Sequence, residues 1–171
     1  SVEKFAHPPK IRGEKFCPGI GIAIEQRSPV TDKRVLVIRQ NISQAGETIR
    51  TWVELSPQSP RGAGNSLRLQ AAAGDAQTPP KALDSPPLQI VSPPVPVRRG
   101  QLLRICGWVR VPERITASPD GLLVYDSLGG PELGERFALT DGWREFTFYR
   151  VAPADGGLSL TFALTGLGDA A

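Results

Sequence analysis

The chain has 171 residues, of which 40% are apolar and 22% charged, and its net charge is +3. This length suits one domain with a sizeable core, and the ordinary composition excludes a disordered chain. No apolar run approaches the roughly 20 residues that a membrane-spanning helix needs. The 18 glycines and 17 prolines favour turns over helices, so we expect an all-β domain with many loops.

The first 19 residues show no periodic pattern, and Pro8-Pro9 indicates an irregular N-terminal arm. In residues 20–26 isoleucines stand at every second position, with small or polar residues between them. That alternation predicts a half-buried strand. We therefore divide the chain into an arm at 1–19 and a β domain at 20–171.

Three further strands are predicted in the next part of the chain, at 34–40, 48–55 and 65–71. In the second of these, Trp52 is out of phase with the apolar side chains, so we expect it to face solvent. In the third, two leucines face inward, and Arg68 lies with its polar neighbours on the solvent side.

A polar, proline-rich connection at 72–87 leads to a short strand at 88–91. The stretch that follows, from Ser92 to Pro112, has a proline-stiffened lead-in and a turn at Arg99-Gly100. It continues as one long strand that ends at Val111, around which we expect the fold to be organised.

The remaining elements are shorter, apart from one long strand at 143–151 that we expect to accompany the central one. They are a strand at 121–127, a loop at 129–142 with a short strand at 136–139, a turn at 152–157 and a strand at 158–164. About nine strands with Gly/Pro turns predict an antiparallel β-sandwich, most simply a jelly roll.

Chemistry-bearing residues are sparse. Cys17 and Cys106 would form a disulfide in an exported protein, or Cys106 is a small core side chain. With one histidine, His7, no zinc site can be assembled. The arginines are scattered among acidic residues, which argues against a nucleic-acid interface.

The acidic residues lie in loop-like segments, and there is no G-x-S-x-G nucleophile motif. Glycine pairs such as Gly129-Gly130 lack the helix that a phosphate-binding loop requires. We therefore expect a non-catalytic protein.

A succession of motifs carries a family resemblance. NSLRLQA is followed by SPPVPVRRGQLLRICGWVRV, GLLVYDS, DGWREFTFYRV and LSLTFALTGLGDA. In order and spacing they resemble the carbohydrate-binding-module type of jelly roll in the galactose-binding-like superfamily, over residues 62–168. The family closes with one more strand, whereas this sequence stops at Ala171, so that strand is absent or another segment replaces it.

The resemblance implies a carbohydrate-binding module of a secreted or surface protein, with glycan as its partner and, in many members, a structural calcium ion. In such modules exposed aromatic rings stack on sugars. We expect Trp108 and Trp143 in the core and nominate Trp52 and Tyr125 as binding rings. Asp126 either holds a sugar hydroxyl or caps a turn.

The low aromatic content, 6%, favours a different function. In this alternative the chain is a structural or adhesive β-sandwich of a larger envelope protein, and its partner is a neighbouring protein domain. An exposed pair of aromatic rings on one sheet face would favour sugar binding over this alternative.

Overall fold

The computed structural model of the chain describes residues 36–43, 46–57 and 65–171. The arm at 1–19, the strand at 20–26 and Cys17 lie outside these ranges. The division of the chain at residue 20 and the disulfide therefore stay predictions.

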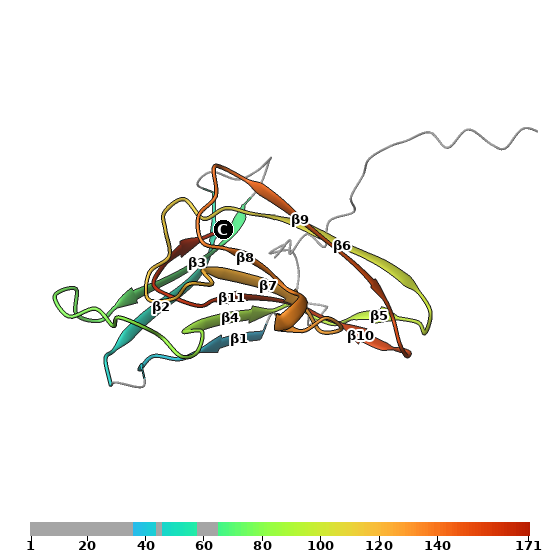
Figure 1. Ribbon diagram of the computed structural model, residues 1–171, viewed down its shortest axis with the longest axis horizontal. Helices are drawn as coiled ribbons and strands as arrows, with labels where there is room; N and C mark the ends of the chain where they lie inside the picture. The colour runs from blue at the N-terminus through green and yellow to red at the C-terminus, as the bar shows by residue number, and fades with distance from the viewer. Residues whose placement is uncertain (1–35, 44–45, 58–64) are drawn as a thin grey trace, which may run out of the picture.

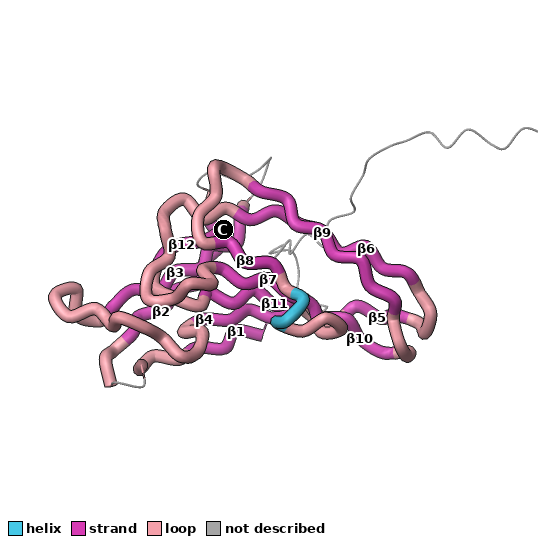
Figure 2. Tube along the Cα trace, in the orientation of Figure 1, coloured by secondary structure: helices cyan, strands magenta, loops and turns pink. Residues whose placement is uncertain are grey.

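The described residues form twelve strands and one short 3₁₀ helix, and every strand pair is antiparallel, which confirms the predicted all-β class (Figure 2). The elements are β1 (Leu36–Arg39), β2 (Ile49–Ser56), β3 (Ser66–Ala73), β4 (Leu88–Val91), β5 (Val95–Val97), β6 (Leu102–Val109), β7 (Leu122–Asp126), η1 (Pro131–Leu133), β8 (Glu135–Phe137), β9 (Arg144–Val151), β10 (Gly156–Leu158), β11 (Leu160–Leu164) and β12 (Gly168–Ala170). In the described part of the chain no helix is long and apolar enough to cross a membrane.

Five strands form the largest sheet, in the order β1-β4-β11-β7-β8 (Figure 1). Its three central strands carry large aliphatic residues at alternate positions, which places those side chains on one face. The buried members are Leu88, Ile90, Leu122, Val124, Leu160 and Leu164. The pair β5–β10 continues the β4–β11 ladder, because the Ser92 amide donates to the Leu160 carbonyl over 2.8 Å.

A second array consists of the sheet β12-β3-β2 and the two-stranded ribbon β6–β9. Two reciprocal backbone hydrogen bonds connect them just beyond the strand ends: Arg110 N to Ala171 O, 2.6 Å, and Ala171 N to Arg110 O, 2.8 Å. In Figure 1 the ribbon lies above and to the right of the five-stranded sheet, at an angle to its strands.

Aromatic rings fill the space between the ribbon and that sheet. The Phe146 ring of β9 lies 5.5 Å from Phe148 and 6.1 Å from Phe162 of β11, centroid to centroid. Gly107 on β6 stands directly opposite Phe146, and a Cβ atom at Gly107 would lie 2.6 Å from the ring. The missing side chain of Gly107 therefore gives the ring its place in the core.

Several predictions are corrected by the structure. Part of the predicted proline-stiffened lead-in is itself a strand, because Val95–Val97 form the short β5. The predicted turn at 152–157 ends in β10, and residues 168–170 pair with β3 as β12. Trp108 and Trp143 are half-buried and lie outside the buried cluster, so their assignment to the core was wrong. Trp108 alternates with the buried Val109 and therefore faces away from the core.

Candidate functional site

The outer face of β2, β3 and β12 brings together an aromatic ring and several charged side chains. Trp52 stands opposite Gln70, which stands opposite Asp169, so the three form a row across three strands. Glu54 and Arg68 form the neighbouring row. Because side chains alternate along a strand, all five project from the same face of the sheet.

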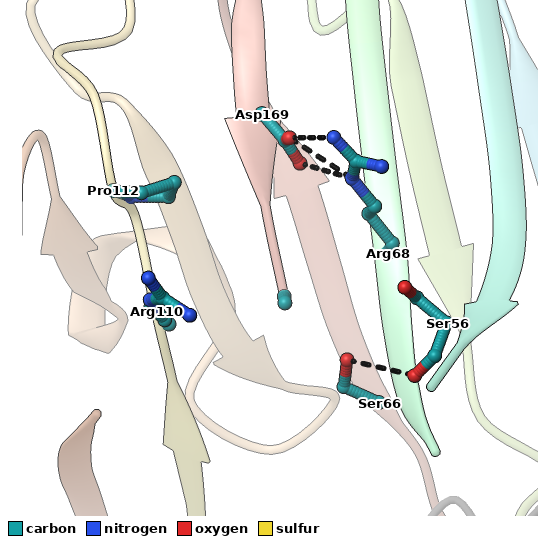
Figure 3. A pocket seen from close by; sticks show the side chains of 7 residues that line it. Ser56, Ser66, Arg68, Arg110, Pro112 and Asp169 are labelled. Atoms are coloured by element: carbon teal, nitrogen blue, oxygen red, sulfur yellow. Dashed lines mark hydrogen bonds and ion pairs between the residues drawn. The ribbon is translucent and has the colours of Figure 1, made fainter. Parts of the chain in front are cut away.

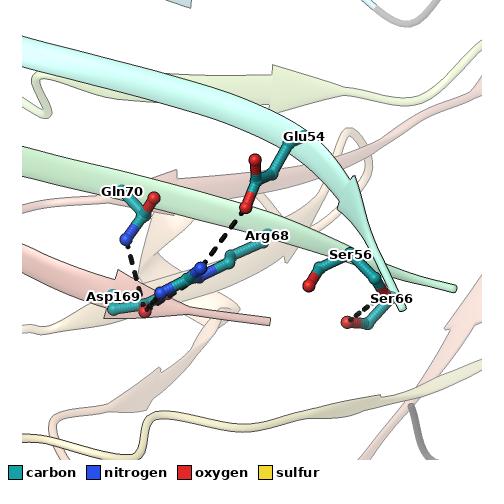
Figure 4. Close-up of polar contacts among 6 residues, drawn as sticks. All are labelled: Glu54, Ser56, Ser66, Arg68, Gln70 and Asp169. Carbon is teal, nitrogen blue, oxygen red and sulfur yellow. Dashed lines mark hydrogen bonds and ion pairs between the residues drawn. The ribbon is translucent and has the colours of Figure 1, made fainter. Parts of the chain in front are cut away.

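The polar members of this face are tied together by Arg68 (Figure 4). Its Nε lies 3.0 Å and 2.9 Å from the two carboxylate oxygens of Asp169, and its Nη2 donates to the same carboxylate. Its Nη1 donates to Glu54 Oε1 over 3.3 Å. The Gln70 amide reaches Asp169 Oδ2 over 3.5 Å. Planar guanidinium geometry thus fixes the orientation of the Asp169 carboxylate and holds Glu54 beside it.

The network is open to solvent on one side. The side chains of Arg68 and Asp169 are 28% and 27% exposed, and Glu54 is 53% exposed. The hydrogen bonds to Asp169 raise the pKa of Arg68 above its ordinary value, so the guanidinium stays charged. Trp52 is 45% exposed, as its alternation with Val53 predicted. The charged side chains are therefore held by one another, and both they and the Trp52 ring are accessible to a ligand.

A pocket of about 170 Å³ continues this face towards β6, lined by Ser56, Ser66, Arg68, Arg110 and Asp169 among others (Figure 3). It is smaller than the roughly 300–1,000 Å³ pockets that enclose small ligands. The candidate site is therefore an open, polar sheet face beside a ring, and the pocket is a depression in it.

Tyr125, the second nominated ring, lies on the other array. It is half-buried on β7, opposite Thr161 of β11, and lines a separate crevice of about 340 Å³. The two nominated rings therefore do not share a site, and they do not form the exposed pair on one sheet face that would have favoured sugar binding.

Asp126 is fully buried, which corrects its assignment to the ligand site. Its Oδ1 accepts hydrogen bonds from the amides of Leu128, 3.0 Å, and Gly129, 2.8 Å. Its Oδ2 lies 2.9 Å from Arg150 Nε, although the N–H bond is not aimed at that oxygen. The capping alternative is thus the observed one, and the attraction to Arg150 is mainly between charges.

Sequence reasoning nominated Trp52 but not the side chains around it. Alternation placed Arg68 and Gln70 on the solvent side of β3, and that was the available signal. Asp169 was missed because its strand, β12, is only three residues long. Its partnership with Arg68 depends on the register between β3 and β12, which no local pattern reveals.

Among the described residues no three His, Cys, Asp or Glu side chains gather in a way that would hold a metal ion. The calcium ion implied by the family resemblance would be bound largely by backbone carbonyls, so it stays a prediction without assigned ligands.

Comparison with models of known protein families finds no match, and comparison with curated proteins finds no significant similarity either.

Proposed function

We propose that this chain is a non-catalytic carbohydrate-binding module whose ligand lies on the outer face of β2, β3 and β12. The observation that carries the proposal is the row of Trp52, Gln70 and Asp169, in which an exposed ring stands beside oriented hydrogen-bonding groups. Sugars combine an apolar C–H face with a rim of hydroxyls, and this row offers a complement to both.

In this proposal one sugar ring stacks on Trp52 and its hydroxyls contact Gln70 and Glu54. Neighbouring strands are about 4.8 Å apart, so the groups beside Trp52 lie within reach of a single ring. The carboxylates accept hydrogen bonds from hydroxyls, while Arg68 keeps them in place. A prearranged polar rim lowers the ordering cost of binding.

The proposal includes a finer fold, the jelly-roll sandwich of the galactose-binding-like type. The reciprocal bonds between Arg110 and Ala171 support it, because they extend β12-β3-β2 into the β6–β9 ribbon. The contact between Phe146 and Phe162 supports the packing of that array on the five-stranded sheet. Modules of this kind occur in secreted and surface proteins, so we propose that location too.

A glycan array followed by calorimetric titration tests the proposal. Trp52→Ala should weaken binding of the best glycan by about ten- to a hundredfold, by analogy with other aromatic stacking. Tyr149→Ala is the matched control, since Tyr149 is also an exposed ring, 62% exposed, but lies on β9. Absence of glycan binding, or equal affinity in all three proteins, would contradict the proposal.

A second candidate function is a structural or adhesive role, and one observation favours it. Leu102 and Val151 stand directly opposite each other on β6 and β9 and are 72% and 62% exposed. With the neighbouring Tyr149 they form an apolar patch suited to a protein partner. If Leu102→Ser weakens attachment to an adjoining domain and no glycan binds, this function is the better one.

A further inference from the structure

The crevice that contains Tyr125 lies on the outer face of the five-stranded sheet. Loop residues 83–86, Ser118 and Asp120 line part of it, and Pro131 of η1 contributes at another point. Strands β4, β7, β8 and β11 supply the rest of the lining, together with Thr165 just after β11. At about 340 Å³ it falls within the range of small-molecule pockets, roughly 300–1,000 Å³.

The crevice exists because a small residue interrupts a row of larger ones. Gln89, Ala163, Leu123 and Arg136 stand opposite one another across β4, β11, β7 and β8. The methyl group of Ala163 leaves a depression between its two neighbours. Tyr125 follows two positions after Leu123 on the same face, so its ring borders that depression.

Some polar groups of the crevice are already engaged. Arg136 Nε lies 2.9 Å from Asp120 Oδ1, and the hydroxyls of Ser118 and Thr165 lie 2.8 Å apart. These pairs belong to the fold and hold the loop before β7 against the sheet.

Three other groups that line the crevice are not engaged in this way. Within the described ranges the Tyr125 hydroxyl, the Gln89 amide and the Asp84 carboxylate have no side-chain hydrogen-bond partner. A half-buried ring together with an uncommitted hydroxyl, amide and carboxylate matches a neutral ligand that has both C–H surface and hydroxyl donors.

We propose that this crevice is a second saccharide site, so that the chain binds two glycan segments at once. The ligand class rests on the proposed function, whereas the crevice itself is independent of the Trp52 face. In the crevice one sugar ring packs against Tyr125, and its hydroxyls donate to Asp84 and to the Gln89 carbonyl oxygen.

The two sites face away from each other. Val53 of β2 and Val124 of β7 both pack into one hydrophobic core. Trp52 directly precedes Val53, and Tyr125 directly follows Val124. Because neighbouring side chains point to opposite faces of a strand, each ring projects from the side of its sheet that faces away from the core. A short oligosaccharide cannot reach both rings, and simultaneous occupation bridges two segments of a polysaccharide. Such bridging raises the apparent affinity for a polymer without any new contact.

The test is ¹⁵N-edited NMR of the complete chain titrated with tetra- to hexasaccharides of D-glucose, D-galactose and D-xylose. Two separate groups of amides should shift, one around Trp52 and Gln70 and one around Tyr125 and Gln89. Tyr125→Ala should reduce affinity in the second group about ten- to a hundredfold and leave the first unchanged. Trp52→Ala should do the reverse.

Tyr125→Phe and Gln89→Ala guard against misfolding, since both keep the packing of the crevice largely intact and each removes one polar group. Shifts confined to the Trp52 group would overturn the second site and leave the proposed function standing. Shifts confined to the Tyr125 group would overturn the Trp52 site instead. If no amide shifts with any sugar, both proposals are wrong.

Discussion

The buried pair of Asp126 and Arg150 offers the sharpest test of the fold. The Asp126 carboxylate is 0% exposed and the Arg150 side chain 17% exposed. Asp126→Ala removes the charge partner of Arg150 and leaves the amides of Leu128 and Gly129 without their acceptor. Removing one member of a buried ion pair costs about 3–5 kcal/mol.

Urea denaturation measures that loss. With a denaturant slope of about 2 kcal/mol per M, a loss of about 4 kcal/mol lowers the midpoint by about 2 M. Asp126→Asn keeps an oxygen acceptor for the turn and loses the charge, so we expect an intermediate loss of about 1–3 kcal/mol.

Asp120→Ala is the matched control. Asp120 also pairs with an arginine, Arg136, at 2.9 Å, but the two side chains are 42% and 44% exposed. Exposed pairs contribute about 0–1 kcal/mol, so the midpoint should fall by at most about 0.5 M. If the variant at Asp126 is no less stable than the one at Asp120, burial does not govern the strength of these pairs, and the reasoning fails.

Two further predictions concern Gly107 and Asp75. Gly107→Ala should destabilise the chain by about 1–3 kcal/mol, because the new methyl group meets the buried Phe146 ring at 2.6 Å; an unchanged thermal midpoint would show that the ring yields freely. Hydrogen bonds from the backbone N–H of Gln77 and from the Thr78 hydroxyl lower the pKa of Asp75. Its contribution to stability is therefore present above the pKa of an unfolded aspartate and is lost as the pH falls through the lower folded pKa. Carbon-detected NMR titration checks this, and a folded midpoint at or above the unfolded one would contradict it.

The parts of the fold that were predictable from sequence are those set by alternation within one strand. Trp52 is out of phase with its apolar neighbours in β2, and it is exposed. The apolar positions of residues 158–164 likewise face inward, although the chain is split there into β10 and β11. Period-two patterns carry this information because each side chain's face follows from its place in the strand.

The alternation of apolar and polar residues does not show which strands are neighbours in a sheet. Asp126 follows a tyrosine and precedes a serine, a sequence equally compatible with a ligand contact and a turn cap. The amides of Leu128 and Gly129, which donate to Asp126, decided for the turn cap. The burial of Asp126 beside Arg150 depends on how the β6–β9 ribbon lies on the sheet, which the sequence does not show. Arg68 was similarly assignable to a face but not to a partner.

The link between Arg68 and Asp169 has a consequence for the order of folding. The two residues are 101 positions apart, so their pairing closes a loop whose entropic cost is about 4 kcal/mol by the logarithmic scaling of loop length. A partly folded chain containing only the β2–β3 hairpin exposes Trp52 but lacks the carboxylate of β12. Contacts of such long range form slowly, so the polar rim should be assembled among the last features of the native state. Recovery of ligand affinity after dilution from urea would then lag behind the recovery of strand structure.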